Sequence, residues 1–315
     1  MNGTERAALD ELSRRVDAHR ASLLELDVEG GPFAKDGPNA TFHHSGWFDP
    51  ATGLPGAARR ELHTAVLARV AASHPDVGSN RRAVLVAGPP GAGKSSIAAG
   101  LLSCFGAPGK TLTEWLPLNN DLFKDELLLL ALADGSYETV LKPKELLERE
   151  ATGEVFFPRE LASLVHEESS QLFGRALSEA VERGQDLLID DVLGEEEDAD
   201  GIMRQLDAAG YQVILADVET SRGIAWQRIE QRWREGYLAA LEGTATGTEL
   251  LLGGRWVPPS IPAALYPGGG SGDSVCAAVG AAVAGRYACI RERLLYRVEA
   301  AQAQPVPVDP GAPAR

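Results

Sequence analysis

Short apolar runs alternate with stretches of helical periodicity along most of the chain. Strands are expected at Ala83–Ala87, Glu114–Leu118, Asp186–Asp190 and Tyr211–Val218, and helical sequence separates each from the next. Strands that alternate with helices build a mostly parallel sheet covered by helices on both faces. The pattern therefore predicts a three-layer α/β fold whose ligands bind at the carboxyl ends of the strands.

Two segments lie outside this alternation. Glu5–Leu26 has the periodicity of a helix with one apolar face, and a loop rich in Gly, Pro and aromatic residues follows it. We expect residues 1–56 to form an N-terminal helical extension and residues 57–300 to form the main domain, which opens with a helix over Ala57–Ala72. Residues 301–315 are rich in Pro and Ala without periodicity, which predicts a disordered tail.

The composition excludes several classes of function. The chain has 315 residues, a hydrophobic content of 44% and a formal charge of −15. Such an acidic protein is expected neither to bind nucleic acid broadly nor to dock on an anionic membrane. A charged N-terminus, short apolar runs and three cysteines without paired spacing favour a cytoplasmic location.

The most specific motif follows the first predicted strand. Gly88-Pro89-Pro90-Gly91-Ala92-Gly93-Lys94-Ser95 fits the phosphate-binding pattern GxxxxGK[ST] at every defined position. Backbone N–H groups of such a loop wrap a triphosphate, and glycines let the backbone come close enough. Lys94 would reach the terminal phosphates and Ser95 would hold Mg²⁺, while Ser96 opens a helix whose N-terminus attracts anions. A phosphate-loop NTPase or kinase fold is therefore expected, and a glycine-rich turn with a chance lysine is the alternative.

An aspartate follows the second predicted strand. In Asn119-Asn120-Asp121-Leu122-Phe123-Lys124, Asp121 would face the γ-phosphate. A small-molecule kinase needs a carboxylate there to orient the acceptor hydroxyl and accept its proton. Asp121 could equally cap the helix expected over Leu122–Leu132. Position alone leaves the two interpretations open.

A pair of aspartates ends the third predicted strand. The run Leu187-Leu188-Ile189-Asp190-Asp191 is typical of a strand whose final carboxylate organises Mg²⁺ bound to nucleotide phosphates. Either Asp190 or Asp191 could hold the water shell of the metal. An ordinary strand-end loop is the alternative, because apolar runs that end in aspartate are common.

Arginines are clustered on the helix expected after the fourth strand. Arg228 and Arg232 stand four residues apart, on one face of that helix. Their guanidinium groups could neutralise charge that develops on a transferred phosphoryl group, and Arg255 is a further candidate. The alternative for each is a solvated surface arginine, which we prefer for Arg222 and Arg234.

These motifs, in this order, resemble the zeta toxin family of kinases. The resemblance rests on GPPGAGKS, NNDLFK, LVHEESSQL followed by a helix, LLID, the arginine helix and GGRWVP, over about residues 60–265. It implies that ATP phosphorylates the 3′-hydroxyl of the amino sugar in UDP-N-acetylglucosamine. It also implies nucleotide and Mg²⁺ contacts by Lys94 and Ser95, catalysis by Asp121, an acidic strand end at Asp190, and transition-state arginines among Arg228, Arg232 and Arg255.

The resemblance also points to substrate contacts. The family holds the sugar nucleotide with an acidic residue on the helix before the third strand, and Glu167 or Glu168 is the nearest candidate. Asn120 and Asp191 border the expected acceptor site. The family has Gly-Thr after the acidic strand end, where this chain has Asp191-Val192. This departure lies beside the acceptor site and bears on specificity for the sugar nucleotide.

Partners and alternative functions complete the expectations. The family's toxins are held inactive by an antitoxin whose helix blocks the ATP site, so an antitoxin protein is an expected partner. Glu5–Leu26 could play that role in cis, or it could be a structural helix that covers the edge of the sheet. The alternative functions are a similar kinase acting on another hydroxyl acceptor, such as an antibiotic, and a non-catalytic ATP-dependent switch.

Overall fold

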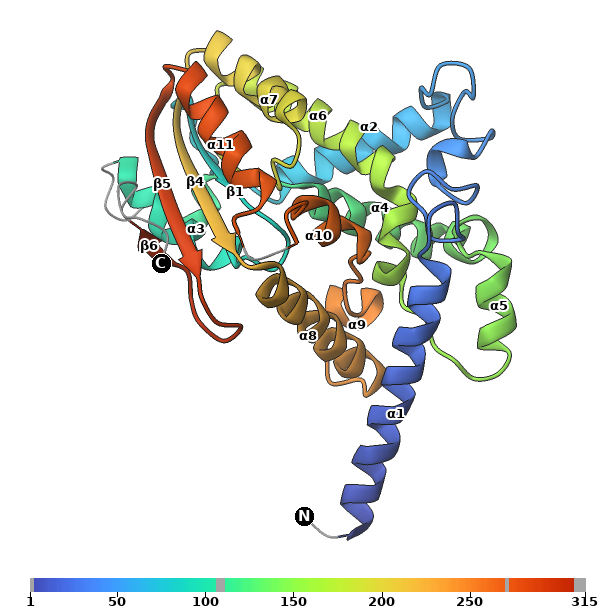
Figure 1. The fold of residues 1–315 in the computed structure, drawn as a ribbon. Helices are drawn as coiled ribbons and strands as arrows, with labels where there is room; N and C mark the ends of the chain where they lie inside the picture. The colour runs from blue at the N-terminus through green and yellow to red at the C-terminus, as the bar shows by residue number, and fades with distance from the viewer. Residues whose placement is uncertain (1–2, 106–110, 270–271, 309–315) are drawn as a thin grey trace. The chain divides into compact units, whose positions relative to one another are not determined.

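The computed structural model describes residues 3–105, 111–269 and 272–308 (Figure 1). The chain divides into two compact units, each assembled from three segments. The first unit consists of Met1–Thr64, Phe123–Ser170 and Glu230–Pro258. The second consists of Ala65–Leu122, Gln171–Ile229 and Pro259–Arg315.

The second unit is built on a six-stranded sheet with the order β2-β3-β1-β4-β5-β6. Every neighbouring pair is parallel except β5 and β6, which are antiparallel. The predicted α/β class with a mostly parallel sheet is thus confirmed. The strands are β1 (Arg82–Ala87), β2 (Leu116–Leu118), β3 (Leu187–Asp190), β4 (Gln212–Thr220), β5 (Ile290–Val298) and β6 (Val306–Val308).

Helices cover both faces of this sheet. Val84, Val86 and Val218 pack with Leu101 and Trp115 in a core on one face. On the other face α7 and α11 lie against β4 (Figure 1). The helices of this unit are α3 (Lys94–Leu101), α7 (Glu196–Ala208), α10 (Ser260–Leu265) and α11 (Val275–Arg286), with 3₁₀ turns at Leu102–Phe105 and Leu112–Glu114.

Among the described residues, four helices have residues in both units, and the helices not yet named lie in the first. The shared helices are α2 (Ala57–Ala72), α4 (Asn120–Asp134), α6 (His166–Glu182) and α8 (Arg222–Leu241). The first unit holds α1 (Gly3–Leu26), α5 (Lys144–Glu150), α9 (Thr248–Leu252), 3₁₀ segments at Thr41–His43 and Pro158–Val165, and a π-helical turn at Tyr137–Leu141. The helices expected from periodicity at 5–26 and 57–72 are confirmed.

The strand register aligns the carboxyl ends of three strands. Leu118 pairs with Ile189, and Ile189 pairs with Leu85. The next residue of β3, Asp190, is the partner of Val86. Neighbouring strands lie about 4.8 Å apart, so the segments that follow β1, β2 and β3 leave the sheet side by side at one edge.

The end of the chain departs from the expected disordered tail. Residues 301–308 form a turn and then β6, in which Val306 pairs with Arg297 and Val308 with Leu295. The expectation is wrong for these residues, because the edge of β5 offers backbone groups to pair with and an edge strand tolerates proline. Residues 309–315 lie outside the described part of the chain.

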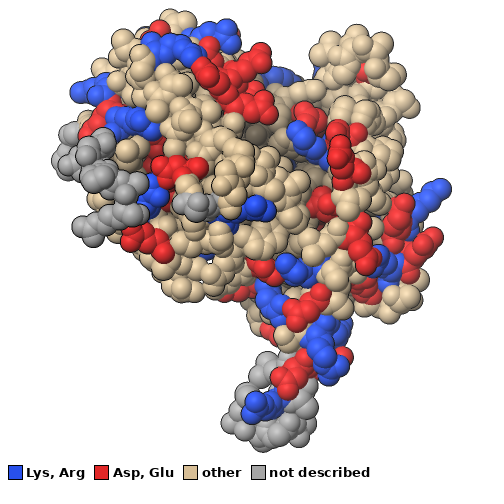
Figure 2. All heavy atoms as spheres, viewed as in Figure 1, with Lys and Arg blue, Asp and Glu red and all other residues tan. Residues whose placement is uncertain are grey.

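Among the residues that the structure describes, no helix has the length and apolar character that a membrane span requires. Figure 2 shows acidic and basic side chains interspersed on one face of the molecule. The net charge of −15 reflects 45 acidic against 30 basic residues in the sequence.

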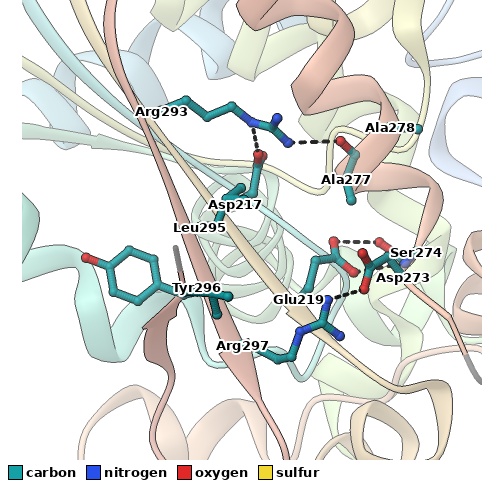
Figure 3. A pocket seen from close by; sticks show the side chains of 11 residues that line it. Asp217, Glu219, Asp273, Ser274, Ala277, Ala278, Arg293, Leu295, Tyr296 and Arg297 are labelled. Atoms are coloured by element: carbon teal, nitrogen blue, oxygen red, sulfur yellow. Dashed lines mark hydrogen bonds and ion pairs between the residues drawn. The ribbon is translucent and has the colours of Figure 1, made fainter. Parts of the chain in front are cut away.

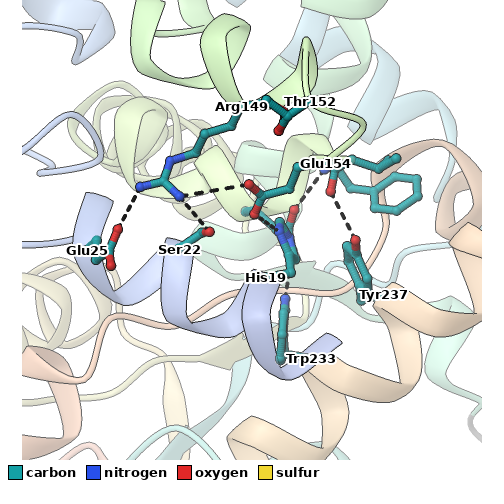
Figure 4. Close-up of polar contacts among 11 residues, drawn as sticks. His19, Ser22, Glu25, Arg149, Thr152, Glu154, Trp233 and Tyr237 are labelled. Atoms are coloured by element: carbon teal, nitrogen blue, oxygen red, sulfur yellow. Dashed lines mark hydrogen bonds and ion pairs between the residues drawn. The ribbon is translucent and has the colours of Figure 1, made fainter. Parts of the chain in front are cut away.

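Helix α1 is built into the interior of the first unit. Val16 and Leu23 are fully buried, and the buried ring of His19 bonds Glu154 through Nδ1 (2.7 Å) and Glu160 through Nε2 (3.0 Å) (Figure 4). Trp233 Nε1 donates to the same Glu160 oxygen at 2.8 Å. This packing supports a structural role for α1, and an inhibitory role in cis stays a prediction.

The acid–base pairing of His19 predicts a pH-dependent stability. Burial opposes the charged imidazole, but Glu160 and Glu154 raise the pKa of His19 above 6.5. A raised histidine pKa stabilises the fold at low pH, and this contribution is lost as pH rises through the folded-state value. We expect His19→Gln to lower the free energy of unfolding by about 1–2 kcal/mol at pH 6, and by less at pH 9.

Urea denaturation of the wild type and the variant at both pH values measures this difference. Arg14→Gln is the control, because Arg14 lies on the same helix and pairs with Glu11 on the surface. If the difference in free energy of unfolding between His19→Gln and the wild type were larger at pH 9 than at pH 6, the raised pKa of His19 would be contradicted.

Candidate active site

The phosphate-binding motif forms a loop between β1 and α3. Gly88 and Gly91 have φ of +138° and +83°. A Cβ at Gly88 would lie 2.2 Å from the carbonyl oxygen of Val218, and one at Gly91 would lie 2.5 Å from that of Ala225. The loop backbone is therefore pressed against the ends of β4 and the start of α8, an approach that only glycine permits.

Lys94 lies between the loop and the end of β3. Its Nζ donates to the carbonyl oxygen of Gly88 at 2.6 Å and lies 3.5 Å from Asp190 Oδ1. Ser95 is exposed in the first turn of α3, and the Ser96 hydroxyl donates to the carbonyl oxygen of Gly93 at 2.6 Å. The strand, loop and helix that the motif requires are all present, with the lysine and a carboxylate at its edge.

Asp121 lies inside the first turn of α4, which begins at Asn120, and not at the N-cap position. The cap is Asn119, whose Oδ1 accepts the N–H of Leu122 at 2.7 Å. The capping alternative for Asp121 is therefore wrong, and an asparagine one residue before the helix was the signal for the true cap. Because α4 follows β2, the partly buried Asp121 leaves the sheet at the same edge as the phosphate loop.

Asn120 carries an unsatisfied polar atom next to Asp121. Its Oδ1 is buried and has no hydrogen-bond partner among the described residues. A buried carbonyl oxygen without a donor costs free energy unless a ligand or water supplies one. This atom is suited to accept a hydrogen bond from a bound molecule.

Asp191 and Val192 support the phosphate loop from the end of β3. Asp191 Oδ1 accepts the N–H of Leu193 at 3.0 Å in a turn where Leu193 has φ of +50°. The carbonyl oxygen of Val192 accepts the N–H of Gly88 at 3.3 Å. Burial raises the pKa of the Asp191 carboxyl, although the charge of Lys94 opposes the shift.

Arg228 joins the phosphate loop to the C-terminal segment. Its guanidinium donates to the carbonyl oxygens of Gly91 (3.0 Å), Ala301 (2.8 Å) and Ala303 (2.6 Å). The structure therefore brings the predicted arginine to the loop. The contribution of residues 301–303 was missed, because nothing in a Pro- and Ala-rich sequence signals it.

Glu168 belongs to the packing of the first unit. It is fully buried, and its carboxylate accepts bonds from Arg59 Nε (2.5 Å) and Arg59 NH2 (2.8 Å) and lies 2.6 Å from His63 Nε2. Burial alone would raise the pKa of Glu168, but His63 and Arg59 lower it. This geometry removes Glu168 from the candidate substrate contacts and leaves Glu167, which is partly exposed.

Two predicted arginines also lie in the first unit. Arg255 donates to both oxygens of Asp125, at 3.0 Å each, and Arg159 binds the same carboxylate. Arg232 is exposed on α8. Arg255 thus has a structural partner, and the catalytic roles of both arginines stay predictions.

Oxygen donors suited to Mg²⁺ are present beside the loop. The Ser95 hydroxyl and the Asp190 carboxylate are hard ligands, which Mg²⁺ combines with phosphate oxygens and waters. In the described part of the chain no three His, Cys, Asp or Glu side chains are grouped to hold a metal by themselves. A metal at this site would therefore be held jointly with the nucleotide.

A cavity of about 450 Å³ lies elsewhere in the second unit, beside α11 and β5 (Figure 3). Its polar residues are largely paired with one another: Asp217 with Arg293, Glu219 with Ser274, and Asp273 with Arg297. Burial raises the pKa of Asp217 to about 6 and that of Glu219 to about 7. None of the predicted site residues lines this cavity.

Comparison with known proteins finds one family model that is similar to part of the chain. Residues 152–275 match the family model described as Zeta toxin. The match is a similarity over less than half of the chain. The matched segment contains the LLID strand, the arginine helix and GGRWVP, whereas the phosphate loop and Asp121 precede it. No curated protein matches the sequence.

Solved structures share the fold. The AvrRxo1-ORF1:AvrRxo1-ORF2 complex with ATP contains a chain that is 18% identical, with a TM-score of 0.53 over 81% of this chain and 68% of that chain. A structure from the PezAT toxin–antitoxin system of Streptococcus pneumoniae is 14% identical, with a TM-score of 0.47 over 75% of this chain and 76% of that chain. With the zeta toxin segment, the first of these supports a phosphate-loop kinase fold.

The tight loop geometry predicts the effect of one added methyl group. Gly91→Ala places a Cβ against Ala225 at a positive φ, so we expect a loss of stability on the order of 2 kcal/mol and loss of ATP binding. Gly100→Ala in α3 is the matched control, because a Cβ there meets nothing within 4 Å. That control should gain about 0.5–1 kcal/mol and bind ATP normally.

Thermal unfolding and titration with a fluorescent ATP analogue measure both variants. Unchanged ATP binding by Gly91→Ala would show that the loop does not hold the nucleotide.

Proposed function

We propose that this protein transfers the γ-phosphoryl group of ATP to a hydroxyl of a sugar nucleotide, UDP-N-acetylglucosamine. The observation that carries the proposal is the strand register, which sets the phosphate loop, Asp190 and the start of α4 at one edge of the sheet. The zeta toxin segment and the phosphate-loop fold support phosphoryl transfer as the class of reaction. The choice of acceptor rests on the family resemblance.

Backbone N–H groups and the charge of Lys94 are proposed to hold the nucleotide. The N–H groups of the loop and of the first turn of α3 would bind the phosphates. Lys94 would exchange its bond to the Gly88 carbonyl for the terminal phosphate oxygens, at a place where Asp190 already lies within 3.5 Å. Mg²⁺ held by Ser95 and Asp190 would supply charge neutralisation on those phosphates.

Asp121 is the proposed general base. It would accept a hydrogen bond from the acceptor hydroxyl and take its proton as the bond to phosphorus forms. Asp121 lies in the first turn of α4, and the cap of that helix is Asn119. Positioning and charge neutralisation then account for most of the rate, as expected for phosphoryl transfer.

The acceptor would be oriented by polar groups around Asp121. Asn120 Oδ1 offers a buried acceptor for a hydroxyl or amide N–H of the sugar. On the family resemblance alone, Glu167 is proposed as an acidic contact of the substrate, and Asp191 is proposed to border the acceptor. Arg232 and Arg255 are proposed to neutralise the negative charge that develops on the phosphoryl group in the transition state.

An antitoxin protein is the proposed partner, and the cytoplasm is the proposed location. The partner rests on the family resemblance, because the family's toxins are held inactive by a separate antitoxin. The location rests on the charged N-terminus and on three cysteines without paired spacing.

The central role of Asp121 is testable by one isosteric change. Asp121→Asn removes the proton acceptor and should lower the turnover of UDP-N-acetylglucosamine by about 10²–10⁴-fold while ATP affinity stays within twofold. Phosphorylated product is measured by mass spectrometry with Mg²⁺ and ATP. Asp134→Asn, at the exposed far end of the same helix, is the matched control and should retain wild-type turnover.

The outcomes separate the candidate functions. Product that forms at the wild-type rate in Asp121→Asn would contradict the assigned base. If the protein binds ATP and phosphorylates another hydroxyl compound but not UDP-N-acetylglucosamine, the acceptor is that other compound. ATP binding with no acceptor-dependent product would favour the non-catalytic switch.

A further inference from the structure

One carboxylate of helix α4 is held by two arginines from other parts of the first unit. Arg159 donates to Asp125 through Nε at 3.0 Å and through a terminal nitrogen at 2.8 Å. A terminal nitrogen of Arg255 lies 3.0 Å from each of the two Asp125 oxygens. The side chains of Asp125 and Arg255 are only 20% and 15% exposed. Asp125 therefore fixes two guanidinium groups in a largely buried place.

Arg159 also holds the backbone that leads to Arg255. Its remaining terminal nitrogen donates to the carbonyl oxygen of Gly253 at 3.2 Å. The contacts thus close a ring, in which Asp125 holds the side chain of Arg255 while Arg159 holds both Asp125 and the backbone at Gly253. A planar guanidinium can direct its donors to several fixed acceptors in this way. The position of Arg255 beside α4 is therefore set at its side chain and at its backbone.

Two glycines before Arg255 are packed without room for a side chain. A Cβ on Gly253, which has φ of +70°, would lie 2.4 Å from the Cβ of Phe157. A Cβ on Gly254 would lie 2.1 Å from the carbonyl oxygen of Trp233. Only glycine permits such an approach of the backbone. The GGRWVP segment is therefore anchored in the first unit in a way that presents Arg255 to Asp125.

Asp125 lies one helical turn after Asp121 on α4. Side chains four residues apart share one face of a helix, with about 5–6 Å between their Cβ atoms. They also lean toward the start of the helix, so Asp125 leans toward the turn that carries Asp121. An arginine neutralises charge on a transferred phosphoryl group only where its guanidinium is held in a fixed direction. The arginine that Asp125 holds is therefore fixed beside the turn of the proposed base.

We propose that Asp125 is a positioning residue for phosphoryl transfer, which holds the guanidinium of Arg255 on the face of α4 that carries Asp121. Arg159 in turn holds Asp125. The inference rests on the proposed function, because it takes the roles of Asp121 and Arg255 from it. It adds a function for Asp125, which no motif of the sequence signals. Asp125 then acts on the rate of transfer through Arg255 and leaves the binding of ATP unchanged.

A longer carboxylate separates positioning from charge compensation. Asp125→Glu keeps the charge that the two arginines need, so it should unfold at nearly the wild-type temperature. It extends the side chain by one methylene group and displaces Arg255. With UDP-N-acetylglucosamine, kcat should therefore fall about tenfold, while KM for ATP stays within twofold. Asp125→Asn also loses the charge, and its kcat should fall further, about a hundredfold.

A double-mutant cycle shows whether Asp125 acts through Arg255. Arg255→Gln removes the guanidinium, so adding Asp125→Glu to it should lower kcat by less than a further twofold. Glu25→Gln is the matched control, because Glu25 is a carboxylate that pairs with Arg149 at 2.7 Å elsewhere in the first unit. This control should retain wild-type kcat.

Nitrogen-15 NMR of the arginine side chains reads the contact in the full chain without turnover. The Nε–H signal of Arg255, assigned by its absence in Arg255→Gln, should shift in Asp125→Glu and stay in place in Glu25→Gln. A signal that does not shift in Asp125→Glu would overturn Asp125 as the residue that positions Arg255, whatever the wild type phosphorylates. A wild type that phosphorylates no hydroxyl compound would overturn the proposed function, and with it a role of Asp125 in transfer, even where the signal shifts.

Two kinetic results would also overturn the proposal. Wild-type kcat in Asp125→Glu would show that the carboxylate only compensates the charge of the two arginines. Losses of Asp125→Glu and Arg255→Gln that multiply in the double variant would show that Asp125 acts independently of Arg255, as a support of the fold.

Discussion

The parallel pairing of β1 with β3 and with β4 is the constraint on which the second unit depends. It sets Asp190 beside Val86 on one side and the Val218 carbonyl against Gly88 on the other. A slip of one residue in either pairing would turn every side chain to the opposite face of the sheet. The geometry of the candidate site therefore depends on the register of the strands as well as on the sequence of the loop.

The first unit depends on buried charges that are paired. Glu168 is held by Arg59 and His63, and Glu160 is held by His19 and Trp233. Removal of one partner from such a pair leaves an uncompensated buried charge, which is strongly destabilising. These contacts tie α1 and α2 to the 3₁₀ and helical segments around them, so the N-terminal region contributes to the fold of the unit.

The sequence predicted the elements whose patterns are local. The helix over 57–72 and the strand, loop and helix of the phosphate site follow from periodicity and from a complete motif. Asp190 could be predicted because it ends an apolar run, and Asp121 because it follows a strand. For the segment around Asp121, the structure adds that the helix cap is Asn119.

The features that were missed depend on tertiary contacts. β5 is rich in arginine and only partly buried, so its pattern resembles that of a surface segment. β6 pairs with an edge that is not visible in the sequence, and Arg228 orders the segment before it. Glu168 was a plausible ligand until Arg59 and His63, more than a hundred residues earlier, were found on its carboxylate.

The account is tested most directly by a crystal structure with Mg²⁺ and a non-hydrolysable ATP analogue. It predicts the triphosphate within Gly88–Ser95, Lys94 Nζ on the terminal phosphates, and Asp121 facing the γ-phosphate across a space for the acceptor. An analogue bound away from the loop, or an Asp121 side chain turned away from the γ-phosphate, would contradict the assignment of a kinase site at this edge of the sheet.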